Sequence, residues 1–192
     1  MTEGRTEETS ARLTSNRALL KQISLGLPDT KAHLIFWSLM WGGLALDLWT
    51  KKVVFEWLAP YEKYSIVEDF LQLVPALNNG AAFGWFSGRV HLLAAVSIGA
   101  VIAILVVFLF SGSRQRLVHV ALGLFAAGVC GNLYDRIFND GSVRDFIDVY
   151  YRSFHWHTFN IADSLLCLGV AALILSTFLT EKPARKRDPQ QK

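Results

Sequence analysis

Residues Val90 to Phe110 read VHLLAAVSIGAVIAILVVFLF, an apolar stretch that contains no Asp, Glu, Lys or Arg. Its length is close to the ~20 residues that an α-helix needs to cross the hydrocarbon core of a bilayer. Three further apolar runs lie on either side of it, at Leu34 to Phe55, Leu117 to Leu133 and Ile161 to Leu179. We therefore expect an all-α membrane protein with four transmembrane helices, at about residues 34–55, 90–110, 117–133 and 161–179.

The composition of the whole chain agrees with a single membrane-embedded domain. The chain has 192 residues, of which 52% are hydrophobic, and its mean hydropathy is +0.31. We expect this domain to span residues 31–181. Residues 1–30 are polar and lack the apolar core and cleavage site of a secretory signal, so they are expected to form a flexible cytosolic extension. Residues 182–192 are expected to form a basic cytosolic tail.

The distribution of Lys and Arg predicts the orientation of the helices. Twelve of the 19 Lys and Arg residues lie before the first apolar run, between the second and third runs, or after the fourth. Basic residues are enriched on the cytoplasmic side of membrane proteins, so both termini are expected in the cytoplasm. The net charge of +3 and the isoelectric point of about 9.0 reflect this asymmetry, and we expect no nucleic-acid partner.

Two longer segments connect the runs on the opposite, outer side. The first, Glu56 to Gly88, contains β-prone stretches at Tyr64 to Val67 and Phe70 to Val74, which predict a small extracytoplasmic β-sheet on the membrane surface. The second, Tyr134 to Thr158, is aromatic and amphipathic, and it is predicted to be an outer loop or helix in the headgroup layer. It would serve as an ordinary aromatic belt, as a lid beside a lipid-facing site, or as both.

Acidic and amide side chains gather at the outer ends of the apolar runs. Asp145 and Asp163 flank one short polar loop, and Asn132 and Asp135 lie at the end of the third run. Charge in a membrane segment is costly unless it faces a polar interior, so such groups indicate a functional site. Two neighbouring carboxylates are typical of general acid–base chemistry. The alternative is that each Asp caps a helix or pairs with a nearby arginine.

Five short motifs hold most of these polar residues. One such motif alone would be weak evidence, whereas five in register with the apolar runs are strong evidence for a single family. In chain order the motifs are DLWTK at Asp47 to Lys51, NNGAAFG at Asn78 to Gly84, GNLYDR at Gly131 to Arg136, VRDFI at Val143 to Ile147 and FNIAD at Phe159 to Asp163.

With these motifs, from Leu34 to Leu179, the sequence resembles the lipoprotein signal peptidases (signal peptidase II), which are aspartic peptidases of the bacterial cytoplasmic (inner) membrane. The resemblance implies that the signal peptide is removed from a prolipoprotein directly before a cysteine that carries diacylglycerol. It also implies an active site at the extracytoplasmic face, sensitivity to globomycin and no cofactor. The implied partners are the lipidated prolipoprotein and membrane lipid, and we expect a monomer.

The resemblance assigns roles to individual residues. Asp145 and Asp163 correspond to the catalytic pair. Two carboxylates a few ångströms apart share one proton, so the ionised one can take a proton from water while the protonated one polarises the scissile carbonyl. Ala162 is small enough to let a peptide approach closely. The residues expected to bind substrate or support the pair are Asn78, Gly80, Asn132, Asp135, Arg136, Asn160, Ala162, Asp47 and Lys51.

Some of these supporting residues also have an ordinary structural role open to them. Asn160 could simply cap the fourth helix. Asp47 and Lys51 form an i,i+4 pair that neutralises itself near the interface, and the resemblance suggests that they also hold the loop that carries Asn78. Arg136 is expected to pair with an acid and organise the outer end of the third helix, although its guanidinium could also meet substrate carbonyls or lipid phosphate.

The chain departs from the family pattern in two places. Arg144 stands directly before Asp145, where the family usually has an apolar residue. The span from Asp135 to Asp145 is one residue longer than the common pattern, at Asn139 to Gly141. Both changes fall in the outer connection and leave the catalytic pair unchanged, but they affect the local loop geometry and the expected substrate preference.

Two other classes of function are compatible with a small polytopic chain. A proton-coupled transporter or channel would use Asp47, Asp135, Asp145 and Asp163 as a relay, but these acids cluster at one membrane face and the second helix adds only Ser97. A non-enzymatic membrane scaffold would not need an intact acid pair. The two cysteines and five histidines lack the spacing of a zinc site, so no metal is expected.

Overall fold

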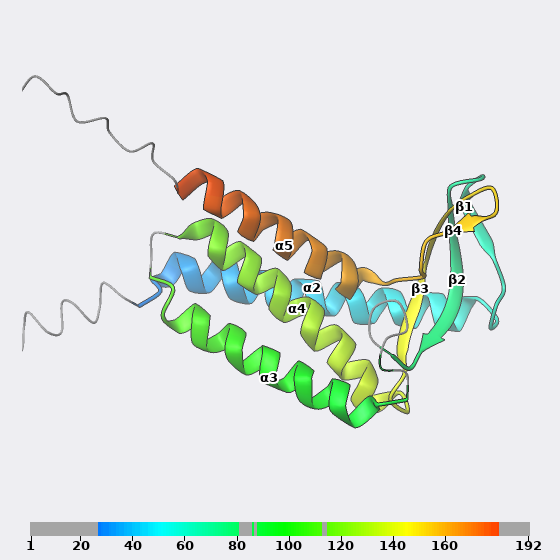
Figure 1. Ribbon diagram of the computed structural model, residues 1–192, viewed down its shortest axis with the longest axis horizontal. Coiled ribbons are helices and arrows are strands. Elements are labelled where there is room, and N and C mark those ends of the chain that lie inside the picture. The colour runs from blue at the N-terminus through cyan, green and yellow to red at the C-terminus, as the bar shows by residue number, and fades with distance from the viewer. Residues whose placement is uncertain (1–26, 81–85, 87, 113–114, 181–192) are drawn as a thin grey trace, which may run out of the picture.

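The computed structural model describes residues 27–80, 86, 88–112 and 115–180. The expected N-terminal extension, the expected basic tail and part of the NNGAAFG motif lie outside the described residues. Four long helices lie alongside one another, and a small sheet lies beyond one end of them (Figure 1). We call this end of the bundle the sheet end and the opposite one the far end.

The helices fall where the apolar runs predict them. They are α2 (Thr30–Trp57), α3 (Val90–Leu109), α4 (Arg116–Phe138) and α5 (Ile161–Thr180). α4 lies at the centre and packs against each of the other three. It continues past the predicted end near residue 133 to Phe138. The polar side chains of its last turns, Asp135 and Arg136, are bonded to other parts of the protein, so these turns need not be a solvated loop.

α2 is the longest of the four described helices. It begins before the predicted start because the Asp29 side chain caps it, accepting the backbone N–H of Ala32 at 2.9 Å. Two charged residues of α2, Asp47 and Lys51, are buried. Among the described helices, α3, α4 and α5 are long and apolar enough to cross a membrane. α2 is long enough but falls short in hydropathy.

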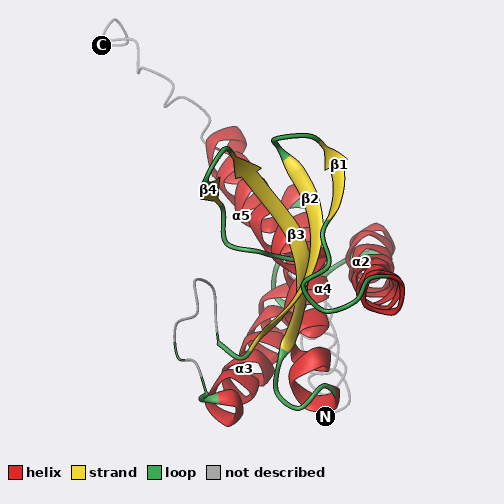
Figure 2. Ribbon diagram, turned by 90° about the vertical axis from the view of Figure 1, so that its right-hand side faces the viewer, coloured by secondary structure: helices red, strands yellow, loops and turns green. Residues whose placement is uncertain are grey.

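The sheet is antiparallel, with the strand order β1-β2-β3-β4. Its strands are β1 (Tyr64–Val67), β2 (Leu71–Asn78), β3 (Val143–Tyr151) and β4 (Phe154–His155). Figure 2 shows β1, β2 and β3 side by side in front of the helix ends. The small sheet predicted from the first outer connection is confirmed, and β1 has the predicted bounds.

The second outer connection differs from the prediction. Instead of an amphipathic loop or helix it forms β3 and β4, which extend the sheet of the first connection. Its β-branched and aromatic residues suit a strand, but a strand forms only where a neighbour pairs with it, and β2 supplies that neighbour. The pairing sets Ala76 opposite Asp145 and Asn78 opposite Val143, so the end of β2 lies beside Asp145.

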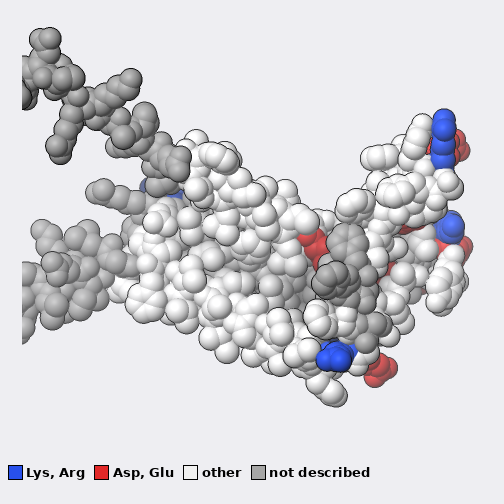
Figure 3. Space-filling view, in the orientation of Figure 1, with Lys and Arg blue, Asp and Glu red and all other residues white. Residues whose placement is uncertain are grey.

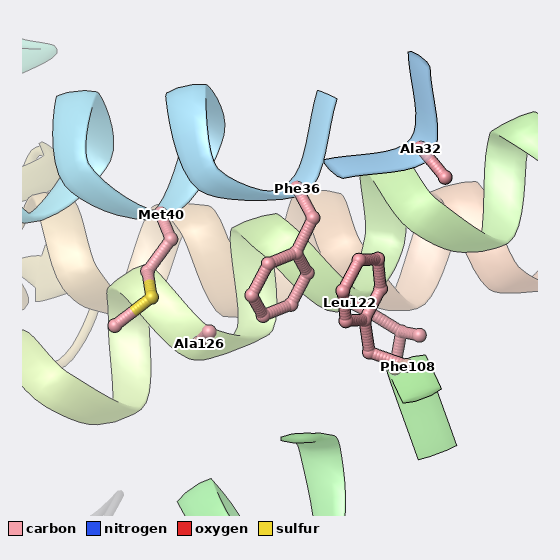
Figure 4. Packing of buried hydrophobic residues seen from close by; sticks show 6 residues of the cluster. All are labelled: Ala32, Phe36, Met40, Phe108, Leu122 and Ala126. Atoms are coloured by element: carbon pink, nitrogen blue, oxygen red, sulfur yellow. The ribbon is translucent and has the colours of Figure 1, made fainter. Parts of the chain in front are cut away.

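The far end of the bundle is held by an apolar core. The rings of Phe36 and Phe108 stack with their centroids 4.2 Å apart, and both are buried between the helices (Figure 4). Close packing of this kind is a main source of attraction between membrane helices. The buried members of this far-end core are Ala32, Phe36, Met40, Phe108, Leu122 and Ala126.

Candidate active site

Asp145 and Asp163 line one cavity at the sheet end, although the first belongs to β3 and the second to the first turn of α5. The cavity has a volume of about 820 Å³ and a mainly apolar wall. Figure 3 shows acidic atoms in the hollow between the helices and the sheet, on a face whose helical part carries few charged side chains. The fold thus gathers acids from a strand and a helix in one apolar recess.

Asn160 connects the two carboxylates. Its Nδ2 donates to Asp145 Oδ1 at 2.6 Å, and its backbone N–H donates to Asp163 Oδ2 at 3.2 Å. The Asp163 N–H donates in return to Asn160 Oδ1 at 3.0 Å, which is the reciprocal pattern of a capping box. Asn160 therefore caps α5, which is the ordinary alternative that the sequence leaves open, and the cap fixes the amide so that its Nδ2 points at Asp145.

A second amide, that of Asn132 in α4, orients Asp163. Asn132 Nδ2 donates to Asp163 Oδ1 at 2.9 Å. Its Oδ1 accepts from Asn160 Nδ2 at 3.1 Å and from Lys51 Nζ at 3.2 Å. Because an ammonium group can only donate, Lys51 determines which way the Asn132 amide faces.

The end of β2 contributes a third amide. Asn78 Nδ2 donates to Asp145 Oδ2 at 3.0 Å, and Asn78 Oδ1 accepts the backbone N–H of Gly80 at 2.9 Å. The Gly80 carbonyl accepts from Arg136 Nη2 at 3.1 Å. The structure therefore brings Asn78, Gly80 and Arg136 together beside Asp145.

Arg136 does not form the ion pair that the sequence predicts. Its guanidinium donates to the backbone carbonyls of Gly80 and, at 3.4 Å, of Asn132, and the ion pairs found among the described residues do not include it. The neighbouring Asp135 instead binds Arg144, with 2.6 Å between Nη2 and Oδ1. Successive helical residues point about 100° apart, so Asp135 and Arg136 face different partners.

A buried ionic cluster lies behind the two aspartates. Lys51 Nζ lies 2.7 Å from Asp47 Oδ2 and 3.1 Å from Asp135 Oδ2, and all three side chains are completely buried. Asp47 Oδ1 accepts the backbone N–H of Ala162 at 2.8 Å. The predicted pairing of Asp47 with Lys51 is confirmed. In the described part of the chain neither side chain contacts Asn78 by a hydrogen bond or ion pair, so the suggestion that they hold its loop finds no support.

Small residues let the helices approach closely around this cluster. A Cβ atom on Gly131 would collide with Asp47 Oδ2 and lie 3.2 Å from the Cβ of Ala162. Ala162 is completely buried and is not part of the cavity wall. Its small side chain therefore serves the contact between α4 and α5, and the structure gives no support for the expected approach of a peptide at this residue.

Asp145 lies in an unusual environment for a carboxyl group. It is 2% exposed, and burial together with the nearby charge of Asp163 raises its pKa from 3.8 to about 7. The hydrogen bonds from Asn78 and Asn160 favour the charged form and oppose this rise in pKa, but they do not outweigh it. The pair thus contains one carboxyl that keeps its proton near neutral pH, as general acid–base chemistry requires.

Several residues of the cavity wall carry no motif that identifies them in the sequence. Ser164, Cys167 and Leu168 line the cavity from α5, and only their i, i+3 and i+4 spacing after the motif marks them as one face. Trp156 and Thr158 border the cavity from the segment around β4, as a lid would. The described residues include no group of three or more His, Cys, Asp and Glu side chains arranged to hold a metal ion.

Comparison with known proteins finds relatives over most of the chain. The model of the family described as Signal peptidase (SPase) II matches residues 39–179. A protein named lipoprotein signal peptidase from Geobacter sulfurreducens is 36% identical over 153 residues, which are 78% of this chain and 95% of that protein. A protein of the same name from Yersinia pestis is 36% identical over 149 residues, which are 74% of this chain and 87% of that protein.

Solved structures have the same fold. A bacterial membrane enzyme determined by the in meso method at 2.3 Å resolution is similar with a TM-score of 0.73 and 27% identity, over 85% of this chain and 97% of that chain. A second bacterial membrane enzyme, determined at 1.9 Å, has a TM-score of 0.68 and 28% identity, over 82% and 99% of the two chains. Four helices with a small sheet at one end are therefore the fold of known bacterial membrane enzymes.

Proposed function

We propose that this chain, which belongs to the signal peptidase II family, is an intramembrane aspartic endopeptidase. Its substrate is a prolipoprotein whose cysteine carries a diacylglyceryl group, and it removes the signal peptide directly before that cysteine. The observation that carries the proposal is the meeting of Asp145 and Asp163 in one cavity, joined through Asn160. Family membership supports the cleavage of lipoprotein signal peptides, and the paired acids support the aspartic type.

Within the pair, Asp145 holds the shared proton and Asp163 is the base. Asp145 is the more deeply buried of the two, and its pKa of about 7 means that it keeps its proton below neutral pH. Asp163 lies in the first turn of α5, where the positive end of the helix dipole and the N–H groups of Asn160 and Asn132 stabilise a negative charge.

The reaction uses water and forms no covalent enzyme intermediate. Asp163 accepts a proton from water as the water oxygen attacks the scissile carbonyl carbon, while Asp145 gives its proton to the carbonyl oxygen. The resulting diol collapses when the C–N bond breaks, the cysteine nitrogen takes the proton from Asp163, and a hydroxyl returns a proton to Asp145. The products are a signal peptide with a free carboxyl group and a lipidated cysteine with a free amino group.

The cavity suits a substrate that is partly a membrane helix and partly lipid. Apolar side chains from three helices, among them Val96 of α3, Val129 of α4 and Leu166 of α5, share its wall with Asp145 and Asp163. Acyl chains and an apolar signal peptide bind such an apolar surface favourably, and the scissile peptide bond then lies beside Asp145 and Asp163. A soluble protease could not reach this bond without extracting the lipid.

We place α2 in the membrane as the fourth span. Trp41 and Trp49 are 59% and 62% exposed, and Leu34 is 62% exposed, so the outward side of this helix is apolar and aromatic. The charges that lower its hydropathy, on Asp47 and Lys51, are buried and paired, which a membrane span tolerates. Four spans put both termini in the cytoplasm and the sheet end at the extracytoplasmic face of the bacterial inner membrane. The chain acts as a monomer.

The far-end core argues against a proton relay. A relay needs polar groups through the whole thickness of the membrane. The far-end core is filled by apolar side chains, among them Phe36, Met40 and Ala126, which can carry no proton. The buried histidine beside this core, His119, is hydrogen-bonded to Ser111 at the far end rather than to the acids of the site.

Cleavage of a lipidated prolipoprotein by the purified full-length chain in detergent tests the catalytic pair. Asp145→Asn and Asp163→Asn are each expected to abolish cleavage while the protein stays folded, because an amide cannot exchange the proton. Asp140→Asn is the matched control, since Asp140 is an exposed acid in the turn before β3, and it should cleave at the wild-type rate. Retained cleavage in either catalytic variant would remove that residue from the mechanism.

The same precursor without its lipid tests the substrate class. It is expected to be cut poorly, because it lacks the acyl chains that rest against the apolar wall of the cavity. Efficient turnover of the unlipidated precursor would exclude the proposed substrate.

A further inference from the structure

The backbone directly before each catalytic aspartate is held by a buried carboxylate. Asp135 Oδ2 accepts the backbone N–H of Arg144 at 2.9 Å. Asp47 Oδ1 accepts the backbone N–H of Ala162 at 2.8 Å. The two residues held in this way immediately precede the two catalytic aspartates in the chain, so each hydrogen bond limits where the next side chain can lie.

One lysine joins these two carboxylates. Lys51 Nζ lies 2.7 Å from Asp47 Oδ2 and 3.1 Å from Asp135 Oδ2, and no part of the three side chains is exposed. Lys51 Nζ also donates to Asn132 Oδ1 at 3.2 Å. The segments that carry the catalytic pair therefore depend on a single ammonium group on α2.

Arg144 completes the charge balance of this cluster. Two aspartates and one lysine carry a formal charge of −1, and such a charge is costly to bury without a partner. Arg144 Nη2 and Nε lie 2.6 and 3.0 Å from Asp135 Oδ1, so its guanidinium supplies the missing positive charge. Its side chain is 19% exposed and closes the cluster from outside.

Arg144 acts away from the reacting atoms. Val143 and Asp145 line the cavity, whereas Arg144 between them does not. This is the alternation expected in a strand, where neighbouring side chains point to opposite faces. The side chain of Arg144 is bonded to Asp135 instead, so we expect its influence on cleavage to pass through Asp135.

We propose that Arg144 is a positioning residue: by completing the buried cluster with Asp47, Lys51 and Asp135, it fixes the backbone in front of both catalytic aspartates. Its effect on cleavage rests on the proposed function. Its effect on the backbone does not, so the two can be measured separately.

The kinetic test compares Arg144→Met, which keeps an unbranched side chain of similar length, with Arg144→Lys, which restores the charge. Arg144→Met is expected to lower kcat for the lipidated prolipoprotein by up to about 100-fold with KM near the wild-type value, since displaced reacting groups slow the chemical step. Arg144→Lys should recover most of the loss. Arg152→Met, which removes an exposed arginine in the turn after β3, is the matched control and should leave kcat unchanged.

The structural test is hydrogen exchange of the full-length chain in detergent, followed by mass spectrometry. Arg144→Met is expected to raise amide exchange both at residues 143–147 and at residues 160–164, and Arg144→Lys to lower it again in both. Faster exchange around Asp145 alone, or unchanged exchange in both segments, would overturn the proposal. So would a wild-type kcat in Arg144→Met.

If Arg144→Met does not fold, a double variant tests the charge-balance argument. The double variant Asp135→Asn with Arg144→Met removes one charge of each sign, so it should fold where the single variant does not. A double variant that is also unfolded would overturn the charge-balance argument. If the wild-type chain does not cleave the lipidated precursor, the proposed function fails, while the exchange experiment still decides the role of Arg144.

Discussion

The two ends of the helix bundle are held together in different ways. At the far end, Phe36 and Phe108 stack within a core whose described buried members are apolar. At the sheet end, Lys51 lies completely buried between two carboxylates. Apolar packing tolerates replacement by residues of similar volume, whereas a buried charge needs all of its partners. The far end therefore stabilises the fold. The sheet end lowers the net stability, because burying charges costs free energy, but the paired charges hold the site in a defined geometry.

The largest effect is expected where the charge at the centre of the sheet end is removed. Lys51→Met leaves Asp47 and Asp135 buried without their shared partner, which destabilises the fold by about 3–5 kcal/mol. It also frees the Asn132 amide that orients Asp163, so cleavage of the lipidated prolipoprotein should be lost. Thermal unfolding in detergent and the cleavage assay measure the two effects.

Lys52→Met is the matched control for this variant. Lys52 is the next residue of α2, and its side chain is 68% exposed. Its removal should change neither stability nor cleavage. Wild-type activity in Lys51→Met would show that the buried cluster does not set the geometry of the site.

A substitution at the far end should separate stability from activity. Phe36→Ala leaves a cavity in the far-end core and should cost about 3 kcal/mol, because the ring of Phe108 loses its stacked neighbour. Cleavage per folded molecule should stay at the wild-type level. The measurement pairs unfolding in detergent with kcat at a temperature where the variant is folded. A reduced kcat at full folding would show that the two ends are not independent.

The pH dependence of cleavage should come from the sheet end. Burial and the charge of Asp163 raise the pKa of Asp145 to about 7, and Asp145 must be protonated to act as the acid. Cleavage should therefore fall as the pH rises through about 7, by about tenfold for each further unit. A rate profile at saturating substrate measures this, and a rate that is flat from pH 6 to pH 9 would contradict the assignment of the proton.

The raised pKa of Asp145 also predicts the sign of its effect on stability. The folded chain keeps the proton up to about pH 7, whereas the unfolded chain releases it near 3.8. The contribution of Asp145 is therefore fully present below 3.8 and is lost as the pH rises through about 7. Unfolding in detergent across this range, with Asp145→Asn as the variant that cannot titrate, measures it.

The smallest effect is expected at the ion pair beyond the far-end core. Arg116 Nη1 and Nη2 each lie 2.6 Å from an Asp29 oxygen, at a site where both side chains are 40% exposed. These bonds and the N–H of Ala32 hold the pKa of Asp29 well below its usual 3.8. Asp29→Asn keeps the helix cap and removes the ion pair, so it should lower Tm only slightly.

The acid side of the Asp29 effect has a definite sign. A carboxyl with a lowered pKa stabilises the fold above its unfolded pKa, and this stability is lost as the pH falls through the folded value. The small difference in Tm between wild type and Asp29→Asn should therefore be present at pH 7 and shrink in strong acid. A loss larger than that of Phe36→Ala would contradict the view that packing stabilises the far end.

The helices and the first strand could be predicted because their signals are local. An apolar run of spanning length forms a helix whatever surrounds it, since its backbone groups must bond to one another in lipid. The segment Tyr64–Val67 likewise carries its own β preference. β3 could not be identified as a strand in this way, because its partner β2 is distant in the chain. Asn78 and Asp145 are 67 positions apart in the sequence, yet their side chains are hydrogen-bonded.

The site shows the same division between local and distant information. The motifs identified Asp145 and Asp163, and Asn160 was recognised as a possible cap because capping depends on residues three apart. Local spacing did not predict which arginine forms the ion pair with Asp135. Arg136 is its neighbour in the chain, but Arg144 is its neighbour in space, because α4 continues past the predicted end and turns Asp135 toward β3.

The sequence by itself determined that this chain has long apolar helices, a small sheet and a set of acids and amides at one end of the helices, because these follow from composition and short-range spacing. Only the tertiary structure decided that Arg144 completes the buried cluster, that Ala162 is enclosed between helices and that the pKa of Asp145 is raised. Burial and charge pairing depend on atoms from four separate segments that meet only after folding, and no local pattern of residues encodes where those atoms come to lie.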